Sequence, residues 1–255
     1  MTAGFSQRAL RHPSFLVGGA LTMLLLLAAA LSLVWTPWPV FDVNMPDKLA
    51  SPSDAHWLGT DPLGRDVASL LLVGARNSIL VGVIAVGIGM TIGTLLGLIA
   101  AACKGWVEEL IMRLSDFTFA FPAILSAIMM TAVFGAGIVN SIIAIGIFNI
   151  PTFARVTRAS ANAIWSREFI LAARACAKGP VRITLEHVLP NVLSVLVVQG
   201  TIQFALAILA EAALSYLGLG TQPPQPSWGR MLSEAQSLLF QAPLLAVFPG
   251  VAIVL

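Results

Sequence analysis

Six apolar runs recur along the chain and are separated by polar stretches. They cover residues 14–35, 77–102, 117–134, 138–154, 192–216 and 237–255. A helix needs about 20 apolar residues to cross the hydrocarbon core of a bilayer, and the runs are close to this length. The pattern predicts an all-α membrane protein with six transmembrane helices.

The first run follows a short basic segment, residues 1–13, which we expect in the cytoplasm. A charged start before an apolar run is also typical of a secretory signal peptide. The run at 14–35 is too long for that class, and it ends in Trp35-Thr-Pro-Trp38 without a small-residue cleavage site. Tryptophan favours the membrane interface, so we predict a retained first transmembrane helix with an interfacial anchor.

Three glycines in the second run, Gly89, Gly93 and Gly97, are spaced four residues apart. This spacing places them on one face of a helix, where small residues let another helix approach closely. We expect a tight helix contact there, and a face that lines a pathway is the alternative. In the fourth run Pro151 lacks a backbone donor, which predicts a break near Asn149.

Basic residues predict the orientation. The polar stretch 155–191 holds six of the fourteen Lys and Arg residues. With the N-terminus in the cytoplasm, ten basic residues lie on inner segments and four on outer ones, and cytoplasmic loops carry the excess of positive charge. We therefore predict that 155–191 is cytoplasmic and that the loop at 36–76 is extracytoplasmic.

Composition narrows the function. The chain is 58% hydrophobic and 10% charged, against about 25% charged residues in soluble domains, and its net charge of +2 does not indicate nucleic-acid binding. Cys103 and Cys176 lack a C-x-x-C spacing, so no disulfide or metal framework is expected. The sequence contains no phosphate-binding loop, which predicts a protein without an ATPase site of its own.

Two acids lie close to the lipid in this arrangement. Asp116 precedes the third run, and Glu211 lies near the end of the fifth. Ionisable groups in a membrane are usually functional or paired, and near helix ends we expect capping or a structural pair. An ion-driven secondary transporter needs acids or broken helices at mid-membrane, and only Pro151 indicates such a feature.

Five short motifs carry a resemblance to one family. They are residues 56–66 (HWLGTDPLGRD), 74–78 (GARNS), 172–174 (AAR), 187–191 (HVLPN) and 214–229 (LSYLGLGTQPPQPSWG). In this order they resemble the ABC-importer permeases for dipeptides, oligopeptides and nickel, specifically the C-type subunit of a heterodimeric permease. The resemblance implies the type I ABC importer permease fold, over residues 77–255, in the bacterial inner membrane.

The same resemblance implies the partners. They are a second permease subunit, two cytoplasmic ATPase subunits that bind the ATP, and an extracytoplasmic solute-binding protein. No cofactor and no nucleic acid is implied. The expected function is to form half of the translocation pathway for di- or oligopeptides.

Residues 155–191 are similar to the family's coupling segment, which docks on the ATPase. Helix formers at 168–178, then Gly179-Pro180, then a periodic apolar run at 181–188 predict a helix, a turn and a helix. The residues expected to carry coupling are Glu168, Ala172, Ala173, Arg174, Ala175, Arg182, His187 and Pro190. Leu171 stands where the family has an acid, and Ala177 where it has a glycine, so either the turn has shifted or coupling is weakened.

Two turn-rich loops are expected at the outer mouth. Rigid loops present partner surfaces well, so we predict a scaffold that supports the solute-binding protein. Its residues are Asp61, Gly64, Arg65, Asp66, Gly220, Pro223 and Trp228.

Two alternatives stay open. One is a permease of the same family for nickel or another small solute. The other is a transport-inactive membrane scaffold, because the coupling segment is altered and the sixth run ends at Leu255 without the family's complete sixth helix and cytoplasmic tail.

Overall fold

The computed structural model describes residues 13–255 and is built from helices. In chain order these are α2 (Pro13–Leu31), η1 (Met45–Asp47), α3 (Val67–Cys103), α4 (Gly105–Ala120), α5 (Ala123–Phe134), α6 (Ile138–Trp165), α7 (Glu168–Ala175), α8 (Pro180–Ile183), the π-helical turn η2 (Thr184–Val188), α9 (Leu189–Tyr216), α10 (Trp228–Ala235), η3 (Gln236–Leu238) and α11 (Leu244–Val254). The basic segment predicted before the first run lies outside the described residues, apart from Pro13.

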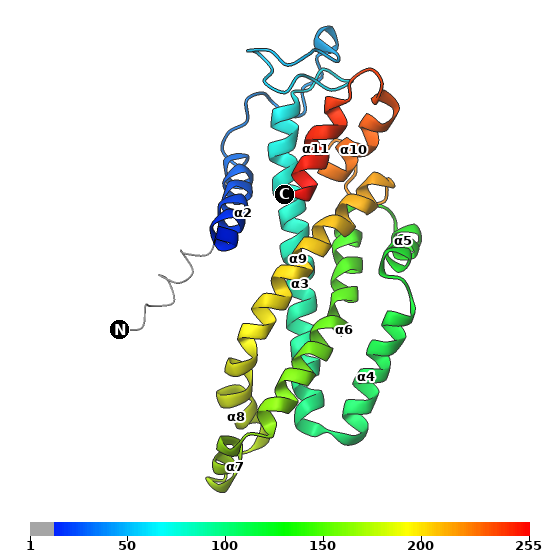
Figure 1. Cartoon of the computed structure of the whole chain (residues 1–255). Coiled ribbons are helices and arrows are strands. Elements are labelled where there is room, and N and C mark those ends of the chain that lie inside the picture. The colour runs from blue at the N-terminus through cyan, green and yellow to red at the C-terminus, as the bar shows by residue number, and fades with distance from the viewer. Residues whose placement is uncertain (1–12) are drawn as a thin grey trace, which may run out of the picture. The chain divides into compact units, whose positions relative to one another are not determined.

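The chain divides into two compact units. The first contains the residues up to Ile79 together with Thr221–Leu255, and the second contains Leu80–Gly220. The helix α3 contributes its first turns to one unit and the rest to the other (Figure 1).

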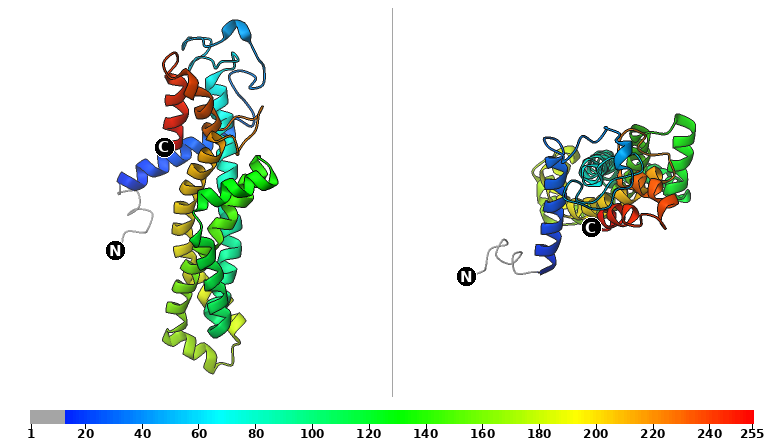
Figure 2. Two further views of the ribbon diagram at one scale, coloured as in Figure 1. Left: turned by 90° about the vertical axis from the view of Figure 1, so that its right-hand side faces the viewer. Right: turned by 90° about the horizontal axis from the view of Figure 1, so that it is seen from above.

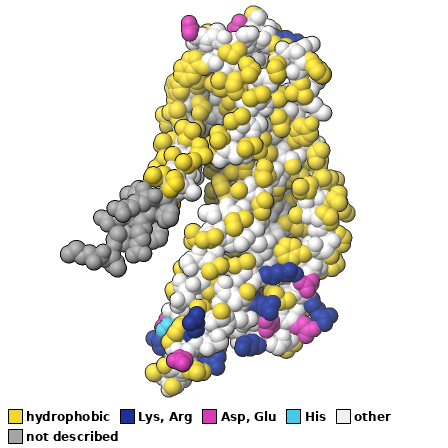
Figure 3. Space-filling view, in the orientation of Figure 1, with side chains coloured by type: hydrophobic (Ala, Val, Ile, Leu, Met, Phe, Trp, Pro, Cys, Tyr) yellow, Lys and Arg dark blue, Asp and Glu magenta, His cyan; other side chains and the backbone are white. Residues whose placement is uncertain are grey.

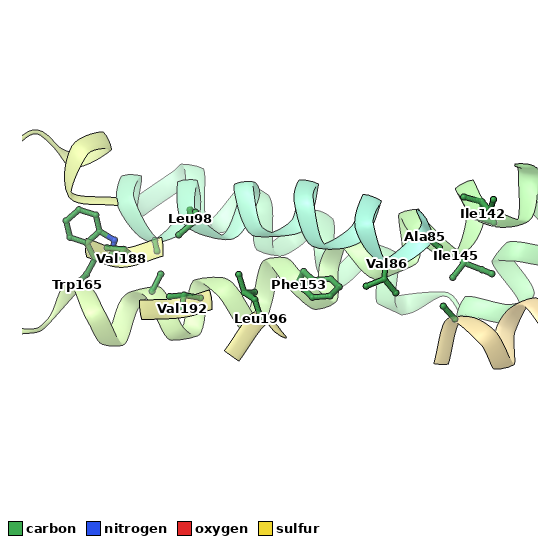
Figure 4. Packing of buried hydrophobic residues seen from close by; sticks show 14 of the residues in the cluster. Ala85, Val86, Leu98, Ile142, Ile145, Phe153, Trp165, Val188, Val192 and Leu196 are labelled. Atoms are coloured by element: carbon green, nitrogen blue, oxygen red, sulfur yellow. The ribbon is translucent and has the colours of Figure 1, made fainter. Parts of the chain in front are cut away.

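The core of the second unit lies where α3, α6 and α9 run side by side (Figures 1 and 2). Phe153 of α6 is fully buried and lies among side chains such as Val86 and Leu196 (Figure 4). The predicted break in α6 is wrong, because the helix continues through Pro151, which is buried. Proline removes one backbone donor, and packing on neighbouring helices keeps the remaining turns in place.

The three glycines spaced by four residues lie against α6. A Cβ added at Gly89 would come within 2.3 Å of the Asn149 Cβ, and one at Gly93 within 2.4 Å of a carbonyl oxygen. At Gly97 the same atom would lie 2.5 Å from the Ala154 carbonyl oxygen. The two backbones therefore approach so closely that only glycine fits on this face.

Among the described helices, four are long and apolar enough to cross a membrane. They are α2, α3, α6 and the continuous helical stretch Pro180–Tyr216. The third predicted run instead falls on α4 and α5, which are bent by 83° at their junction. The sixth run contains α11, an apolar helix of 11 residues.

Helix ends differ from the apolar runs. The helix α3 begins at Val67, within the stretch predicted as an outer loop, and α4 begins at Gly105, in the polar stretch between the second and third runs. Hydropathy marks where lipid contact ends, whereas a helix continues as long as its backbone hydrogen bonds and caps permit.

Charged side chains of the second unit gather at one end, over α7, α8 and the adjoining ends of α4 and α6 (Figure 3). Two ion pairs join α4 to α6, Asp116 with Arg155 and Glu108 with Arg158. Glu211 is buried on α9 and accepts a hydrogen bond from the Ser215 hydroxyl at 2.6 Å. Both lipid-proximal acids are therefore paired, as expected.

Candidate functional site

The helix α7 is anchored by one apolar face. Ile170 and Ala173, three residues apart, are both buried and belong to the same core cluster as Trp165 and Ile183. The Arg174 guanidinium lies 5.3 Å from the centroid of the Trp165 ring, a cation–π contact. Two buried side chains and one ring contact thus hold α7 against the end of α6 and the start of α8.

The opposite face of α7 is open to solvent. Leu171 is 60% exposed, and Ala172, Arg174 and Ala175 are exposed beside it. Small side chains let another surface approach closely, and Arg174 supplies a positive charge at the helix end. We call Leu171, Ala172, Arg174 and Ala175 the coupling surface, after the role that the sequence resemblance predicts for this segment. Ala173 is not part of it, because its side chain points inward.

Glu168 and Arg182 also lie on the exposed side of this segment, whereas His187 is half-buried. Glu168 occupies the first turn of α7, where a carboxylate is favoured by the helix dipole. Pro190 is exposed and lies just after the π-helical turn η2, inside the continuous helical stretch Pro180–Tyr216, from which it removes one backbone donor.

The turn after α7 has a well-defined geometry with an unusual residue. The backbone N–H of Ala177 donates to the Arg174 carbonyl oxygen (2.9 Å), and the backbone N–H of Lys178 donates to the Ala173 carbonyl oxygen (3.2 Å). These are the two hydrogen bonds of a Schellman motif. Ala177 has φ +58°, a left-handed conformation that glycine adopts freely and alanine does not. The turn has therefore not shifted to Gly179, and the departure at Ala177 is a strained helix cap.

A charged cluster closes the segment. The Glu186 carboxylate accepts from Lys178 Nζ and from Arg182 Nε, both at 2.5 Å. Lys178 Nζ also lies 3.2 Å from His187 Nε2. These contacts tie the turn after α7 to the helix that continues into α9, at a solvent-exposed surface.

In the first unit, the motif at 56–66 folds into a tight cage. Asp61 accepts from the backbone N–H groups of Leu63 and Arg65 (both 2.8 Å) and from Arg65 Nε (2.6 Å). Gly64 has φ +74°, and a Cβ there would lie 1.8 Å from the Asn44 carbonyl oxygen. Glycine at this position lets the segment around Asn44 pack on the cage.

Asp66 forms the centre of a second, buried network. Its Oδ1 lies 3.0 Å from His56 Nδ1, and its Oδ2 accepts from the backbone N–H and the hydroxyl of Ser69, both at 2.8 Å. The Ser69 hydroxyl oxygen in turn accepts from the Trp38 backbone N–H at 3.0 Å. Asp66 therefore caps the first turn of α3 and links it to the loop before it.

The remaining outer-loop residues have separate places. Trp228 is buried, and its indole N–H donates to the Leu71 carbonyl at 3.1 Å, against Gly74. Gly220 belongs to the second unit, where a Cβ would lie 2.1 Å from the Ser215 hydroxyl. Pro223 precedes a cis peptide bond to Pro224. The structure therefore brings together Asp61, Gly64, Arg65 and Asp66 but not the whole predicted set.

Several residues that build these sites were not among those predicted. Trp165 and Ile170 anchor α7, and His56, Ser69 and Trp38 complete the buried network. His56 lies within the 56–66 motif, so its place in the motif was a usable signal. The role of Trp165 depends on the direction in which α7 folds back, which no local pattern encodes.

Comparisons with known proteins agree on one family. A family model described as the binding-protein-dependent transport system inner membrane component matches residues 93–255. The glutathione transport system permease protein GsiD of Pectobacterium atrosepticum is 41% identical over 252 residues, covering 98% of this chain and 84% of that protein. GsiD of Escherichia coli O6:K15:H31 is 45% identical over 250 residues, covering 97% and 82%.

Among solved structures, an inward-facing form of the MetNI methionine ABC transporter superposes with a TM-score of 0.63. The match covers 72% of this chain and 88% of that chain at 18% sequence identity. A second inward-facing MetNI crystal form has a TM-score of 0.60 at 17% identity. At this identity the likeness concerns the fold alone, which is the type I ABC importer permease fold.

Proposed function

The chain belongs to the family of binding-protein-dependent transport system inner membrane components, and from this membership we propose that it is a permease subunit of an ATP-driven importer of short peptides. The observation that carries the proposal is the 41–45% identity to glutathione permeases over nearly the whole chain. Glutathione is a tripeptide, so a peptide of about that size is the proposed cargo.

In this proposal the chain forms half of the translocation pathway, beside a second permease subunit. Of the two ATPase subunits in the complex, one docks on the coupling surface in the cytoplasm, and a solute-binding protein delivers the peptide to the outer loops. The excess of basic residues on segment 155–191 supports this orientation. ATP is bound by the partners, and this chain acts without covalent chemistry of its own.

The packing of α7 supports a mechanical link. Ile170 and Ala173 are buried in a cluster that also includes residues of α6 and α9. A force applied to the exposed face of α7 is therefore transmitted through tightly packed side chains to both long helices. Movement of the ATPases would in this way change the tilt of α6 and α9 and alternate access to the pathway.

The experiment that tests the proposal is reconstitution. The chain is co-expressed with the genes that neighbour its own, and the complex recovered through a tag on this chain is placed in proteoliposomes with the solute-binding protein. We expect ATP-dependent uptake of labelled glutathione or a dipeptide. A complex with a phosphate-loop lysine variant of the ATPase serves as the control and is expected to transport nothing.

Two outcomes would replace the proposal. Failure to recover any ATPase with the intact chain would favour the transport-inactive scaffold. Uptake of nickel ion but of no peptide would show that the chain is a permease for nickel or another small solute.

A further inference from the structure

The loop between α2 and α3 frames a cavity of about 380 Å³. It is lined by Trp38, Pro39, Asp42, Val43, Asn44, His56, Gly64, Arg65 and Asp66. The volume falls in the range of small-ligand sites. Both walls, segment 38–44 and the motif at 56–66, belong to the same compact unit. The outer-loop scaffold role does not require such a cavity.

His56 presents a hydrogen-bond acceptor to this space. A carboxylate accepts hydrogen bonds, so the contact of 3.0 Å between Asp66 Oδ1 and His56 Nδ1 favours the tautomer with the ring proton on Nδ1. In a neutral imidazole the other nitrogen, Nε2, is then an acceptor. Within residues 13–255, Nε2 of His56 has no hydrogen-bond partner.

Two further residues in the lining, Asn44 and Asp42, carry acceptor groups. The Asn44 side-chain N–H donates to Asp47 at 2.6 Å, which leaves the Asn44 amide oxygen as an acceptor. Asp42 is exposed, and its carboxylate makes no ion pair within the part of the chain that the structure describes. The cavity thus combines an imidazole nitrogen, an amide oxygen and a carboxylate.

Trp38, the aromatic residue in the lining, is held in place by two hydrogen bonds. The Trp38 indole N–H donates to the Ala55 carbonyl at 2.8 Å, and the backbone N–H donates to Ser69. The indole lies over the His56 ring with centroids 4.9 Å apart, yet Trp38 stays 44% exposed. An indole face attracts cations through its quadrupole.

The one basic residue in the lining is already neutralised. Arg65 pairs with Asp61 at 2.6 Å and with Glu234 at 3.4 Å. The lining therefore has no free positive charge to oppose a cation.

We propose that this cavity binds a primary ammonium group. Such a group carries three N–H donors and a positive charge, which match the acceptors, the Asp42 carboxylate and the Trp38 ring. Two molecules supply this chemistry at a membrane, the N-terminus of a short peptide and the headgroup of phosphatidylethanolamine. The proposal does not depend on transport, because binding is measured without ATP.

The test uses the full chain in the complex with its partner subunits, held in phosphatidylcholine nanodiscs for the first arm. In one arm glycyl-leucine is titrated by calorimetry and compared with N-acetyl-glycyl-leucine, which lacks the ammonium. In the other arm, native mass spectrometry of the detergent-solubilised complex compares phosphatidylethanolamine with phosphatidylcholine, whose headgroup has no N–H donor. We expect one ammonium ligand to bind at least tenfold more tightly than its blocked counterpart.

The key variant is Asp42→Asn, with Asp54→Asn as the matched control on the same loop. Both acids are exposed, so neither change threatens the fold, and Asp54 does not line the cavity. Loss of a charge-assisted hydrogen bond weakens binding by about tenfold. We expect this loss for Asp42→Asn and wild-type affinity for Asp54→Asn.

The arm that responds identifies the source of the ammonium. Equal binding of the blocked ligands, binding in neither arm, or equal affinity of the two variants would overturn the proposal. Failure of peptide uptake in the reconstituted importer would leave this result unaffected, because the two measurements are separate.

Discussion

In the outer-loop cluster, buried Asp66 accepts three hydrogen bonds, from His56 and Ser69, at 2.8–3.0 Å. In the coupling segment, α7 is held by two apolar side chains, one cation–π contact and a set of exposed ion pairs. A buried charge that loses its partners costs several kcal/mol, whereas exposed pairs contribute little. The outer-loop cluster is therefore fixed by buried hydrogen bonds, and the coupling segment is held mainly by apolar packing.

This difference suits the two roles proposed above for the outer loop and for the coupling segment. A loop that receives a partner from outside needs one conformation, and a buried polar network specifies it strongly. A segment that transmits movement needs firm contact with the helices behind it, and a surface in front that tolerates displacement.

Asp66→Ala is expected to be the most damaging change. It removes the acceptor of three hydrogen bonds and leaves the buried groups of His56 and Ser69 unpaired, at a cost of about 3 kcal/mol in the free energy of unfolding. The measurement is unfolding in mixed micelles by titration with SDS. Asp54→Ala, an exposed acid on the same loop, serves as the control. A loss below about 1 kcal/mol would mean that the network is not what fixes the loop.

Ala173→Trp and Ala172→Trp separate the two faces of α7. At buried Ala173 a large ring overpacks the core and lowers stability by about 1–3 kcal/mol. At exposed Ala172 it leaves stability within about 0.5 kcal/mol but blocks close approach of the ATPase. We expect uptake to fall in both variants, with a normal SDS midpoint only for Ala172→Trp. Undiminished uptake in Ala172→Trp would remove that residue from the coupling surface.

Ala177→Gly is expected to stabilise the chain. Glycine adopts the left-handed conformation without strain, which stabilises the folded chain by about 1–2 kcal/mol. Glycine also makes the unfolded chain more flexible, which lowers the free energy of unfolding. The expected net increase in the free energy of unfolding is about 0.5–1 kcal/mol. Ala172→Gly, inside the helix, is the matched comparison and is expected to lose about 1 kcal/mol. A loss of stability in Ala177→Gly would show that the turn is unstrained.

Glu186→Gln is expected to have the smallest effect. Glu186 pairs with Lys178 and Arg182 at an exposed surface, where solvent and salt weaken the attraction. The melting temperature should change little, and the difference from the wild type should shrink further as NaCl rises from 0.05 to about 0.5 M. If Glu186→Gln lowered the free energy of unfolding in the SDS titration as much as Asp66→Ala does, charged pairs would fix this segment too.

Much of the architecture was predictable from simple periodicities. Glycines spaced by four identified the face of α3 that meets α6, because that spacing returns to the same side of a helix. Apolar runs identified the helices of spanning length. The predicted run missed the start of α3, because Arg76 and Asn77 interrupt the apolar sequence, whereas the helix begins before them, where Asp66 caps its first turn.

The sites were less predictable, because they depend on which way each side chain faces in the folded chain. The Ala172-Ala173 pair marks a small surface, but which alanine faces outward depends on how Ile170 and Trp165 pack together. The left-handed backbone at Ala177 is likewise invisible in the composition of the turn, although the family comparison marked the position as one that normally has glycine. The binding cavity at Asp42 depends on two segments that lie more than ten residues apart.

The chain turns by 83° between α4 and α5, so the last carbonyls of α4 lack helical donors. With 12 residues, α5 is about 18 Å long, well short of the hydrocarbon thickness of about 30 Å. Lipid tails offer no hydrogen bonds, so bare backbone at that depth faces protein or water. A break of this kind inside the bilayer therefore needs a neighbouring helix or a water-filled space beside it.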